Sequence, residues 1–255
     1  MTTQHGDFIW YELMTADPHA AAAFYGDVVG WQSRPFDAGV AGGYHIFSTG
    51  DEDAGGLMAL PEGGATPAWI GYVAVRDVDA AAAALVADGA TLLVPPTDIP
   101  NVGRFAVIAD PQGAVFTIMR GAMEHDSPAF SPDKAGHTRW NELSTTDPEA
   151  AFAFYSRHFG WTKGEAMPMG DLGVYQLLDH GGHTFGALMR AQPQQPAPAW
   201  TFYFGVADID VAAAKTTAGG GRVLHGPAEV PGGEFIIVAE DPQGVAFALV
   251  GPRTT

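Results

Sequence analysis

The chain has 255 residues, 47% of them hydrophobic, and its 29 acidic residues outnumber its 12 lysines and arginines, giving a formal net charge of −17. Nucleic acids and anionic membranes bind basic surfaces, so this charge disfavours both as partners. The sequence has no cysteine, which excludes disulfides, thiolate metal sites and a cysteine nucleophile. It also lacks a signal-peptide pattern and any apolar run of about eighteen residues, so we expect a cytoplasmic protein, long enough for two domains.

The first predicted element is a strand over residues 8–14, whose alternation places Trp10 and Glu12 on the same face. Asp17 followed by Pro18 then predicts the start of a helix. The aspartate side chain can accept a hydrogen bond from an unpaired backbone N–H, and proline has no N–H to leave unpaired. The apolar residues that follow recur at the i, i+3, i+4, i+7 spacing of a helix with one buried face.

The same plan continues along the chain. Two short strands are predicted at 44–48 and 56–60, and then a strand at 69–75 leads into a helix capped by Asp77. Further strands are expected near 91–94, 105–109 and 114–119. The tight turn DPQG at 110–113 joins the last two, because proline presets φ and glycine tolerates the left-handed region. Each unit is therefore a strand, a helix and about three strands.

The whole pattern occurs twice. The segment WYELMTADPHAAAAFYGDVVGW at 10–31 recurs as WNELSTTDPEAAFAFYSRHFGW at 140–161, and residues 67–90 recur at 198–221. The offset between the copies drifts only from 130 to 131 residues, which indicates tandem duplication. We predict domains at 1–122 and 137–255, joined by a polar, proline-bearing linker at 123–136.

These motifs resemble the vicinal oxygen chelate superfamily, which includes glyoxalase I, bleomycin-resistance proteins and extradiol dioxygenases. The resemblance rests on a strand running into Asp-Pro, a helix with AFYG or AFYS closed by Gly-Trp, a second Asp-capped helix, and a closing DPQG turn. It covers about 7–120 and 137–251. It implies an α+β fold made by tandem duplication of paired βαβββ modules. The four modules would form two curled mixed β-sheet cups with helices on the outside.

In metal-using members of that superfamily, the cup holds a divalent ion bound by His, Gln or Glu. The resemblance places these ligands at three positions of each copy, occupied here by Trp10 and Trp140, Thr117 and Ala248, and Met58 and Leu188. None of these side chains is a ligand for a hard divalent cation. We therefore expect no metal at these positions and no other cofactor.

Glu12 and Glu142 are the candidate catalytic residues. Each lies two residues beyond a tryptophan on the predicted cup face, where it can act as a general acid or base or hold a cationic ligand. The alternative is a structural brace to buried backbone or to an arginine such as Arg139. The candidate ligand-binding residues, which would otherwise fill the core, are Trp10, Trp140, Tyr44, His45, Trp69, Tyr72, Arg104, Tyr175, Trp200 and Tyr203.

Three functions remain open at this point. The first is a glyoxalase- or bleomycin-resistance-like protein that binds or transforms a small organic compound in an aromatic, glutamate-bearing cup without the usual metal. The second is a metal-dependent lyase, isomerase or dioxygenase with displaced ligands, such as Glu12 with His45. The third is a non-enzymatic interaction module. The duplication also predicts an internal pseudo-dimer, present as a monomer or weak homodimer.

The two cups are not expected to be equivalent. The first copy has Tyr44, His45 and Arg104 near its cup, and the matching positions of the second are Tyr175, Gln176 and Glu234; we expect the first to be the more specific.

Overall fold

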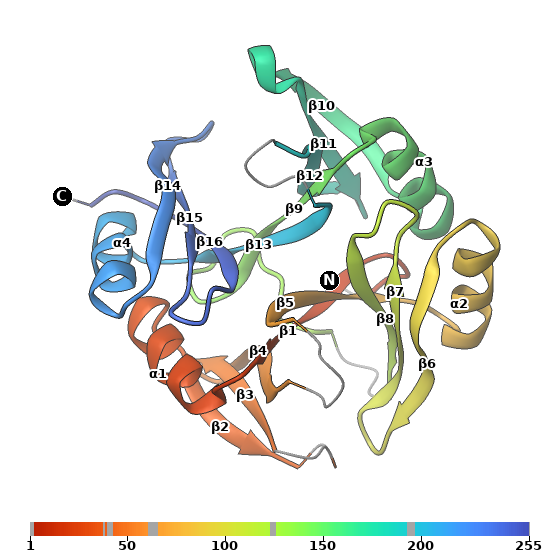
Figure 1. The fold of residues 1–255 in the computed structure, drawn as a ribbon, viewed down its shortest axis with the longest axis horizontal. Helices are drawn as coiled ribbons and strands as arrows, with labels where there is room; N and C mark the ends of the chain where they lie inside the picture. The colour runs from red at the N-terminus through yellow and green to blue at the C-terminus, as the bar shows by residue number, and fades with distance from the viewer. Residues whose placement is uncertain are drawn as a thin grey trace. The chain divides into compact units, whose positions relative to one another are not determined.

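The computed structural model describes residues 3–37, 39, 43–60, 66–122, 126–192 and 197–254. Its first half contains β1 (Phe8–Thr15), α1 (Pro18–Val28), β2 (Gln32–Phe36), β3 (Tyr44–Thr49), β4 (Glu52–Ala59), β5 (Ala68–Ala74), α2 (Val78–Ala87), β6 (Thr91–Ile99), β7 (Gly103–Ala109) and β8 (Val115–Gly121) (Figure 1). Its second half contains β9 (Thr138–Thr145), α3 (Pro148–Phe159), β10 (Thr162–Pro168), the 3-10 turn η1 (Gly170–Leu172), β11 (Val174–His180), β12 (His183–Arg190), β13 (Ala199–Gly205), α4 (Ile209–Ala218), β14 (Arg222–Glu229), β15 (Phe235–Glu240) and β16 (Ala246–Gly251).

Each copy of the repeat forms one eight-stranded sheet. The strand order is β2-β3-β4-β1-β5-β8-β7-β6 in the first copy and β10-β11-β12-β9-β13-β16-β15-β14 in the second. Both sheets are mixed, because β1 runs parallel to β4 and β5 parallel to β8, while the hairpins are antiparallel. Neither sheet closes on itself. The predicted α+β duplication of paired βαβββ modules is confirmed.

The chain forms two compact units, and these do not coincide with the two copies of the sequence repeat. Unit 1 consists of Met1–Ile9, Gly71–Ser127 and Trp140–Trp200, and unit 2 of Trp10–Ile70, Pro128–Arg139 and Thr201–Thr255. Each unit therefore joins one module from each copy. The predicted domain boundaries at 1–122 and 137–255 follow the sheets and stay a prediction.

Part of the predicted linker is packed rather than extended. Within 123–136, residues 123–125 lie outside the described residues, and residues 128–136 belong to unit 2. The amide N–H of Thr138 donates to the carbonyl of Ala129 at 3.0 Å, and His137 Nδ1 lies 2.7 Å from the Pro128 carbonyl. Ala129 and His137 are both buried.

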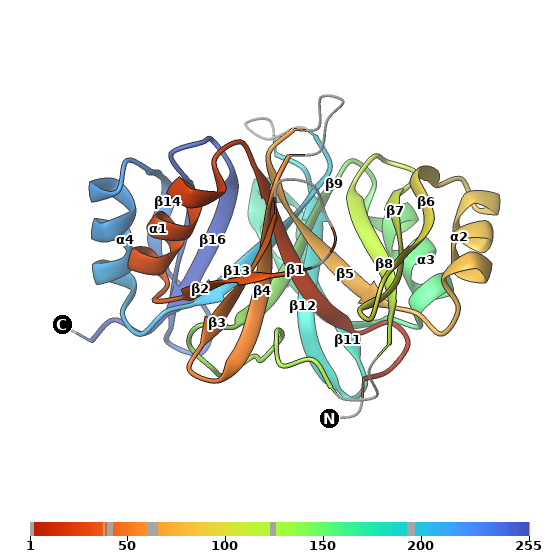
Figure 2. The same cartoon turned by 90° about the horizontal axis from the view of Figure 1, so that it is seen from below.

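The four α-helices that the structure describes all begin as the sequence predicts for the first two. Asp17, Asp77, Asp147 and Asp208 stand at the N-caps, and each carboxylate accepts a hydrogen bond from the amide three residues ahead at 2.9 to 3.1 Å. Pro18 and Pro148 follow at the first helical position. In unit 2, α1 lies beside α4, and in unit 1, α2 lies beside α3 (Figures 1 and 2). In the part of the chain that the structure describes, each helix is too short or too polar to cross a membrane.

The Gly-Trp that closes the first helix of each copy forms a clamp in the core. Trp31 Nε1 donates to the carbonyl of Gly136 at 2.7 Å in unit 2, and Trp161 Nε1 donates to the carbonyl of Gly6 at 2.9 Å in unit 1. Both indoles are buried. Each clamp gives the polar edge of a large apolar ring a hydrogen-bond partner, which burial of a tryptophan requires.

Candidate functional site

A chain of hydrogen bonds links three predicted site residues in unit 1. Trp140 on β9 donates from its indole Nε1 to the hydroxyl of Tyr175 on β11 at 2.8 Å. The Tyr175 hydroxyl in turn donates to Glu142 Oε2 at 2.6 Å. A phenol that donates to a carboxylate makes a short, charge-assisted bond, which holds both side chains in place.

Unit 2 contains the same arrangement. Trp10 Nε1 donates to the Tyr44 hydroxyl at 2.9 Å, and that hydroxyl is hydrogen-bonded to Glu12, which is 7% exposed. Burial, and after it the charge of Glu12, raise the pKa of Tyr44 well above its ordinary value. Tyr44 therefore stays protonated and acts as a donor. We call Trp10–Tyr44–Glu12 and Trp140–Tyr175–Glu142 the Trp–Tyr–Glu triads.

Strand register brings the first triad together. Glu12 on β1 stands opposite Gly56 on β4, and Tyr44 on β3 stands opposite Met58, which is also on β4. Gly56 has no side chain, and a Cβ there would lie 1.8 Å from the Tyr44 hydroxyl oxygen. The tyrosine can therefore pass over the Gly56 backbone to reach Glu12. In the second sheet, Ala187 stands opposite Glu142.

The edge strand β2 extends the same face. Phe36 is paired with Tyr44, their ring centroids are 6.3 Å apart, and Phe36 is 38% exposed. Strand alternation predicted one shared face for the tryptophan and the glutamate, and for a glutamate that is a structural brace the sequence left the partner open between an arginine and buried backbone. The partner that the structure adds is tyrosine.

Trp69 and Trp200 belong to a second repeated network. Trp69 Nε1 donates to the Tyr25 hydroxyl at 3.0 Å, and this hydroxyl donates to Asp241 Oδ2 at 3.2 Å. In unit 1, Trp200 donates to Tyr155 at 3.2 Å and Tyr155 to Asp110 Oδ2 at 3.0 Å. Both tryptophans are 7% exposed, so the structure places them in the core of their units.

The aspartates of this network also hold the DPQG turns. Asp110 Oδ1 accepts from the backbone N–H groups of Gln112, Gly113 and Ala114 at 2.8 to 2.9 Å. Burial, and after it the neighbouring aspartate, raise the pKa of Tyr155 and of Tyr25 well above the ordinary value, and burial raises the pKa of Asp241. Sequence reasoning assigned no partner to these tyrosines, although both AFY and DPQG occur in each copy.

The other predicted ligand-binding residues lie apart from the triads. His45 Nδ1 lies 3.2 Å from Ser33 Oγ, and alternation along β3 puts His45 on the face opposite Tyr44. Arg104 is in unit 1, where it pairs with Asp79 at 2.8 Å and with Asp98 at 2.9 Å. The hydrogen bond that it donates to Asp79 is the first cause of its raised pKa.

Two further predicted residues are tyrosines on the fifth strand of each sheet. Tyr72 and Tyr203 are buried and stand in register with Thr117 and Ala248. These registers bring both tyrosines beside closing-strand positions that the superfamily resemblance assigns to a metal ligand.

The side chains at the implied metal positions do not fit a divalent ion. The indole N–H of Trp10 is already donated to Tyr44, and an indole offers no lone pair to a cation. Thr117 is fully buried, and its hydroxyl has no hydrogen-bond partner among the described residues. No three His, Asp or Glu side chains within the described ranges gather closely enough to hold an ion.

Comparison with protein families and relatives places these features in context. A model described as the Glyoxalase/Bleomycin resistance protein/Dioxygenase superfamily matches residues 134–249, and one described as a glyoxalase-like domain matches residues 10–119. The putative glyoxylase CFP32 of Mycobacterium tuberculosis is 34% identical over 248 residues, which cover 95% of this chain and 94% of the relative. The anthracycline biosynthesis protein DauV of Streptomyces sp. strain C5 is 31% identical over 265 residues, with coverage of 96% and 92%.

Solved structures share the fold at lower sequence identity. The 2,3-dioxygenase LapB from Pseudomonas sp. KL28 matches with a TM-score of 0.67 and 16% identity, covering 99% of this chain and 94% of its own. The Mn(II)-bound glyoxalase from Novosphingobium aromaticivorans matches with a TM-score of 0.66 and 16% identity, covering 98% and 83%. At this identity the likeness concerns the fold alone.

Proposed function

Because the chain belongs to the glyoxalase/bleomycin resistance protein/dioxygenase superfamily, we propose that it binds a small organic molecule at its Trp–Tyr–Glu triads, without a divalent ion at the superfamily's usual positions. The observation that carries the proposal is the hydrogen-bond chain from indole to phenol to carboxylate. It is built from the same three residue types in both copies, and its tryptophan occupies the implied position of a metal ligand.

The triad offers a ligand two kinds of contact. A carboxylate can accept about four hydrogen bonds, so a glutamate that accepts from tyrosine can also accept from a hydroxyl or amine of a ligand. The rings of Trp10, Tyr44 and Phe36 lie on the sheet face that carries Glu12, and aromatic faces stack on planar ligands. The triad therefore favours a planar molecule that carries hydrogen-bond donors.

The relatives support the same ligand class. DauV is named as an anthracycline biosynthesis protein, and anthracyclines are planar, hydroxylated aromatic compounds. We therefore infer that this chain takes a hydroxylated aromatic molecule. The metal-dependent alternative lacks a donor set, because Glu12 is hydrogen-bonded to Tyr44, and His45 lies on the opposite face of β3.

Changing Glu12 to Gln is expected to weaken ligand binding about 10-fold to 100-fold, which corresponds to about 1–3 kcal/mol for a hydrogen bond to a charged group. Glutamine keeps the shape and can still accept from Tyr44, so the melting temperature should change little. The same is expected of Glu142→Gln with Tyr175. The measurement is fluorescence titration with a hydroxyanthraquinone, together with thermal unfolding of each variant.

Glu149→Gln serves as the control, because Glu149 lies at the start of α3 with 80% of its side chain exposed and pairs with Lys163. Its binding and stability should match the unchanged protein. Equal losses of stability at Glu12 and Glu142 with unaltered affinity would show that the glutamates are structural braces, and the binding role would be lost.

Protein purified without a metal-affinity tag is expected to contain no stoichiometric divalent ion by elemental analysis. The reason is the donor set, since indole and thioether groups do not hold a hard cation. A chelator should accordingly leave hydroxyanthraquinone binding unchanged. One equivalent of metal that is lost in Glu12→Gln or Glu142→Gln would favour instead a lyase, isomerase or dioxygenase with displaced ligands.

A further inference from the structure

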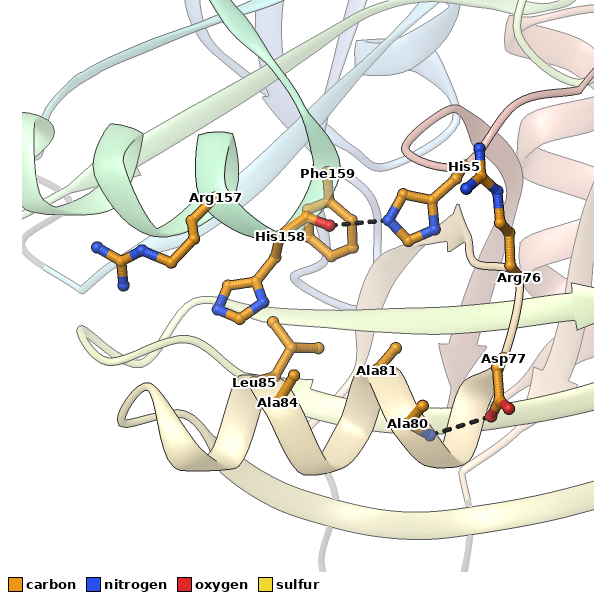
Figure 3. Close-up of a pocket in the computed structure, with 10 residues that line it drawn as sticks. All are labelled: His5, Arg76, Asp77, Ala80, Ala81, Ala84, Leu85, Arg157, His158 and Phe159. Atoms are coloured by element: carbon orange, nitrogen blue, oxygen red, sulfur yellow. Dashed lines mark hydrogen bonds between the residues drawn. The ribbon is translucent and has the colours of Figure 1, made fainter.

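A hollow of about 280 Å³ lies between helices α2 and α3 of unit 1, and none of the residues that line it belongs to a triad. Its floor is the small-residue face of α2, and Leu85 and Phe159 supply apolar walls (Figure 3). The lining is completed by four nitrogen-bearing side chains, His5, Arg76, Arg157 and His158, and by Asp77, whose carboxylate caps α2 and accepts from the amide of Ala80. A chain with a net charge of −17 thus gathers two arginines and two histidines around one apolar hollow.

The two groups on α3 are already paired. His158 Nε2 lies 2.9 Å from Asp88 Oδ2, and Arg157 binds the same carboxylate. The hydrogen bond from His158, and after it the charge of Arg157, hold the pKa of Asp88 below its ordinary value. This cluster ties the C-cap of α2 to the end of α3 and leaves the other end of the hollow to His5 and Arg76.

His5 and Arg76 keep unused hydrogen-bonding capacity. His5 Nε2 lies 2.8 Å from the carbonyl of His158 and donates to it, so the tautomer with its proton on Nε2 presents Nδ1 as an acceptor. Nδ1 is buried without a hydrogen-bond partner in the part of the chain that the structure describes. Within the same ranges, the guanidinium of the exposed Arg76 makes no hydrogen bond or ion pair.

Unit 2, which has the same pair of helices, shows that the fold does not require this lining. At the equivalent positions of unit 2, Ala207 stands for Arg76 and Ala135 for His5. Lys215 on α4 stands where unit 1 has Ala84 on α2. Its ammonium donates to the carbonyl of Asp27 on α1 at 2.8 Å. The helix pair of unit 2 is therefore bridged where unit 1 has a hollow.

We propose that the hollow between α2 and α3 is a second binding site, which takes a small aromatic carboxylate that carries a hydroxyl group. Arg76 pairs with the carboxylate, because a guanidinium matches its two oxygens. The alanine floor with Leu85 and Phe159 covers the ring. The hydroxyl donates to Nδ1 of His5, which satisfies the buried acceptor.

The test is calorimetric titration of the whole protein with 4-hydroxybenzoate, benzoate and 4-hydroxybenzyl alcohol. We expect saturable one-to-one binding of 4-hydroxybenzoate, weaker binding of benzoate, and binding of the alcohol at least about tenfold weaker, because the alcohol lacks the charged group. Arg76→Ala should weaken the binding of 4-hydroxybenzoate by about tenfold as well. Ala84→Leu, which fills the floor of the hollow at an exposed helical position, should abolish binding while leaving the melting temperature unchanged.

Two controls separate this site from the triads. Arg222→Ala removes an arginine that is 71% exposed in unit 2 and should not alter the affinity. The carboxylates of Glu12 and Glu142 disfavour an anionic ligand at the triads, and Arg76→Ala should leave hydroxyanthraquinone binding unchanged, because Arg76 belongs to neither triad. No saturable binding to the unchanged protein, or binding that survives both Arg76→Ala and Ala84→Leu, overturns the proposal.

Discussion

Replacing Asp110 with alanine is expected to lower the free energy of unfolding by about 3–5 kcal/mol. Asp110 is 3% exposed, and its carboxylate accepts four hydrogen bonds, from the backbone N–H groups of Gln112, Gly113 and Ala114 and from Tyr155. A buried donor left without a partner costs about 1–3 kcal/mol. Water can reach the turn amides more easily than the tyrosine, which is why the expected total is below the sum of four such losses.

Urea denaturation measures this effect, and the duplication supplies a matched variant. Asp241→Ala removes the equivalent acceptor from Gln243, Val245 and Tyr25 in unit 2. It should lower the free energy of unfolding by a similar amount. Asp51→Ala, at an exposed turn position, should change stability by less than about 0.5 kcal/mol. A loss below about 1 kcal/mol at both Asp110 and Asp241 would mean that the carboxylates do not hold the turns and helices together.

Replacing Trp161 with alanine is expected to cost about 3–5 kcal/mol, the range for removing a large aromatic side chain from a core. Trp161 is fully buried and packs against Tyr155 and Phe185, with ring centroids 5.1 and 4.8 Å away. Its N–H also donates to the carbonyl of Gly6, where a side chain would meet the backbone of Phe159 at 2.4 Å. The substitution therefore removes packing and a backbone clamp together.

Trp161→Phe separates the two contributions, because it keeps much of the ring and removes the N–H. Trp161→Phe should lower the free energy of unfolding by less than Trp161→Ala does. Equilibrium unfolding in urea measures this free energy for both variants. Leu93→Ala is the control, since Leu93 is 49% exposed and should lose little. Equal stability of Trp161→Ala and Leu93→Ala would contradict the role assigned to the clamp.

Local features of the sequence predicted the elements and their order. Asp17 and Asp77 cap their helices as expected, because N-capping depends only on neighbouring residues. The repeat at an offset of 130 to 131 residues predicted the duplicated sheets, and its motifs identified the superfamily, as the family models confirm. The absence of metal, the cytoplasmic location and the monomeric state stay predictions.

The partners of the polar side chains could not be derived in this way. Tyr25 donates to Asp241, 216 residues away, and only the packing of modules from different copies brings them together. The sequence left Trp69 open between a ligand-binding role and a place in the core, because an indole has the same pattern in either place. Its N–H is donated to Tyr25 inside unit 2.

The sequence by itself determined the four βαβββ modules, their duplication and the pairing of tryptophan with glutamate on one strand face, since each follows from local propensity or from period-two alternation. The tertiary structure decided that Tyr44 and Tyr175 join those pairs, and that Arg76 on one copy lines a hollow with His158 of the other. Both depend on strand register and helix packing between residues far apart in the chain. No local signal encodes those contacts, because their free energy appears only when the distant elements meet.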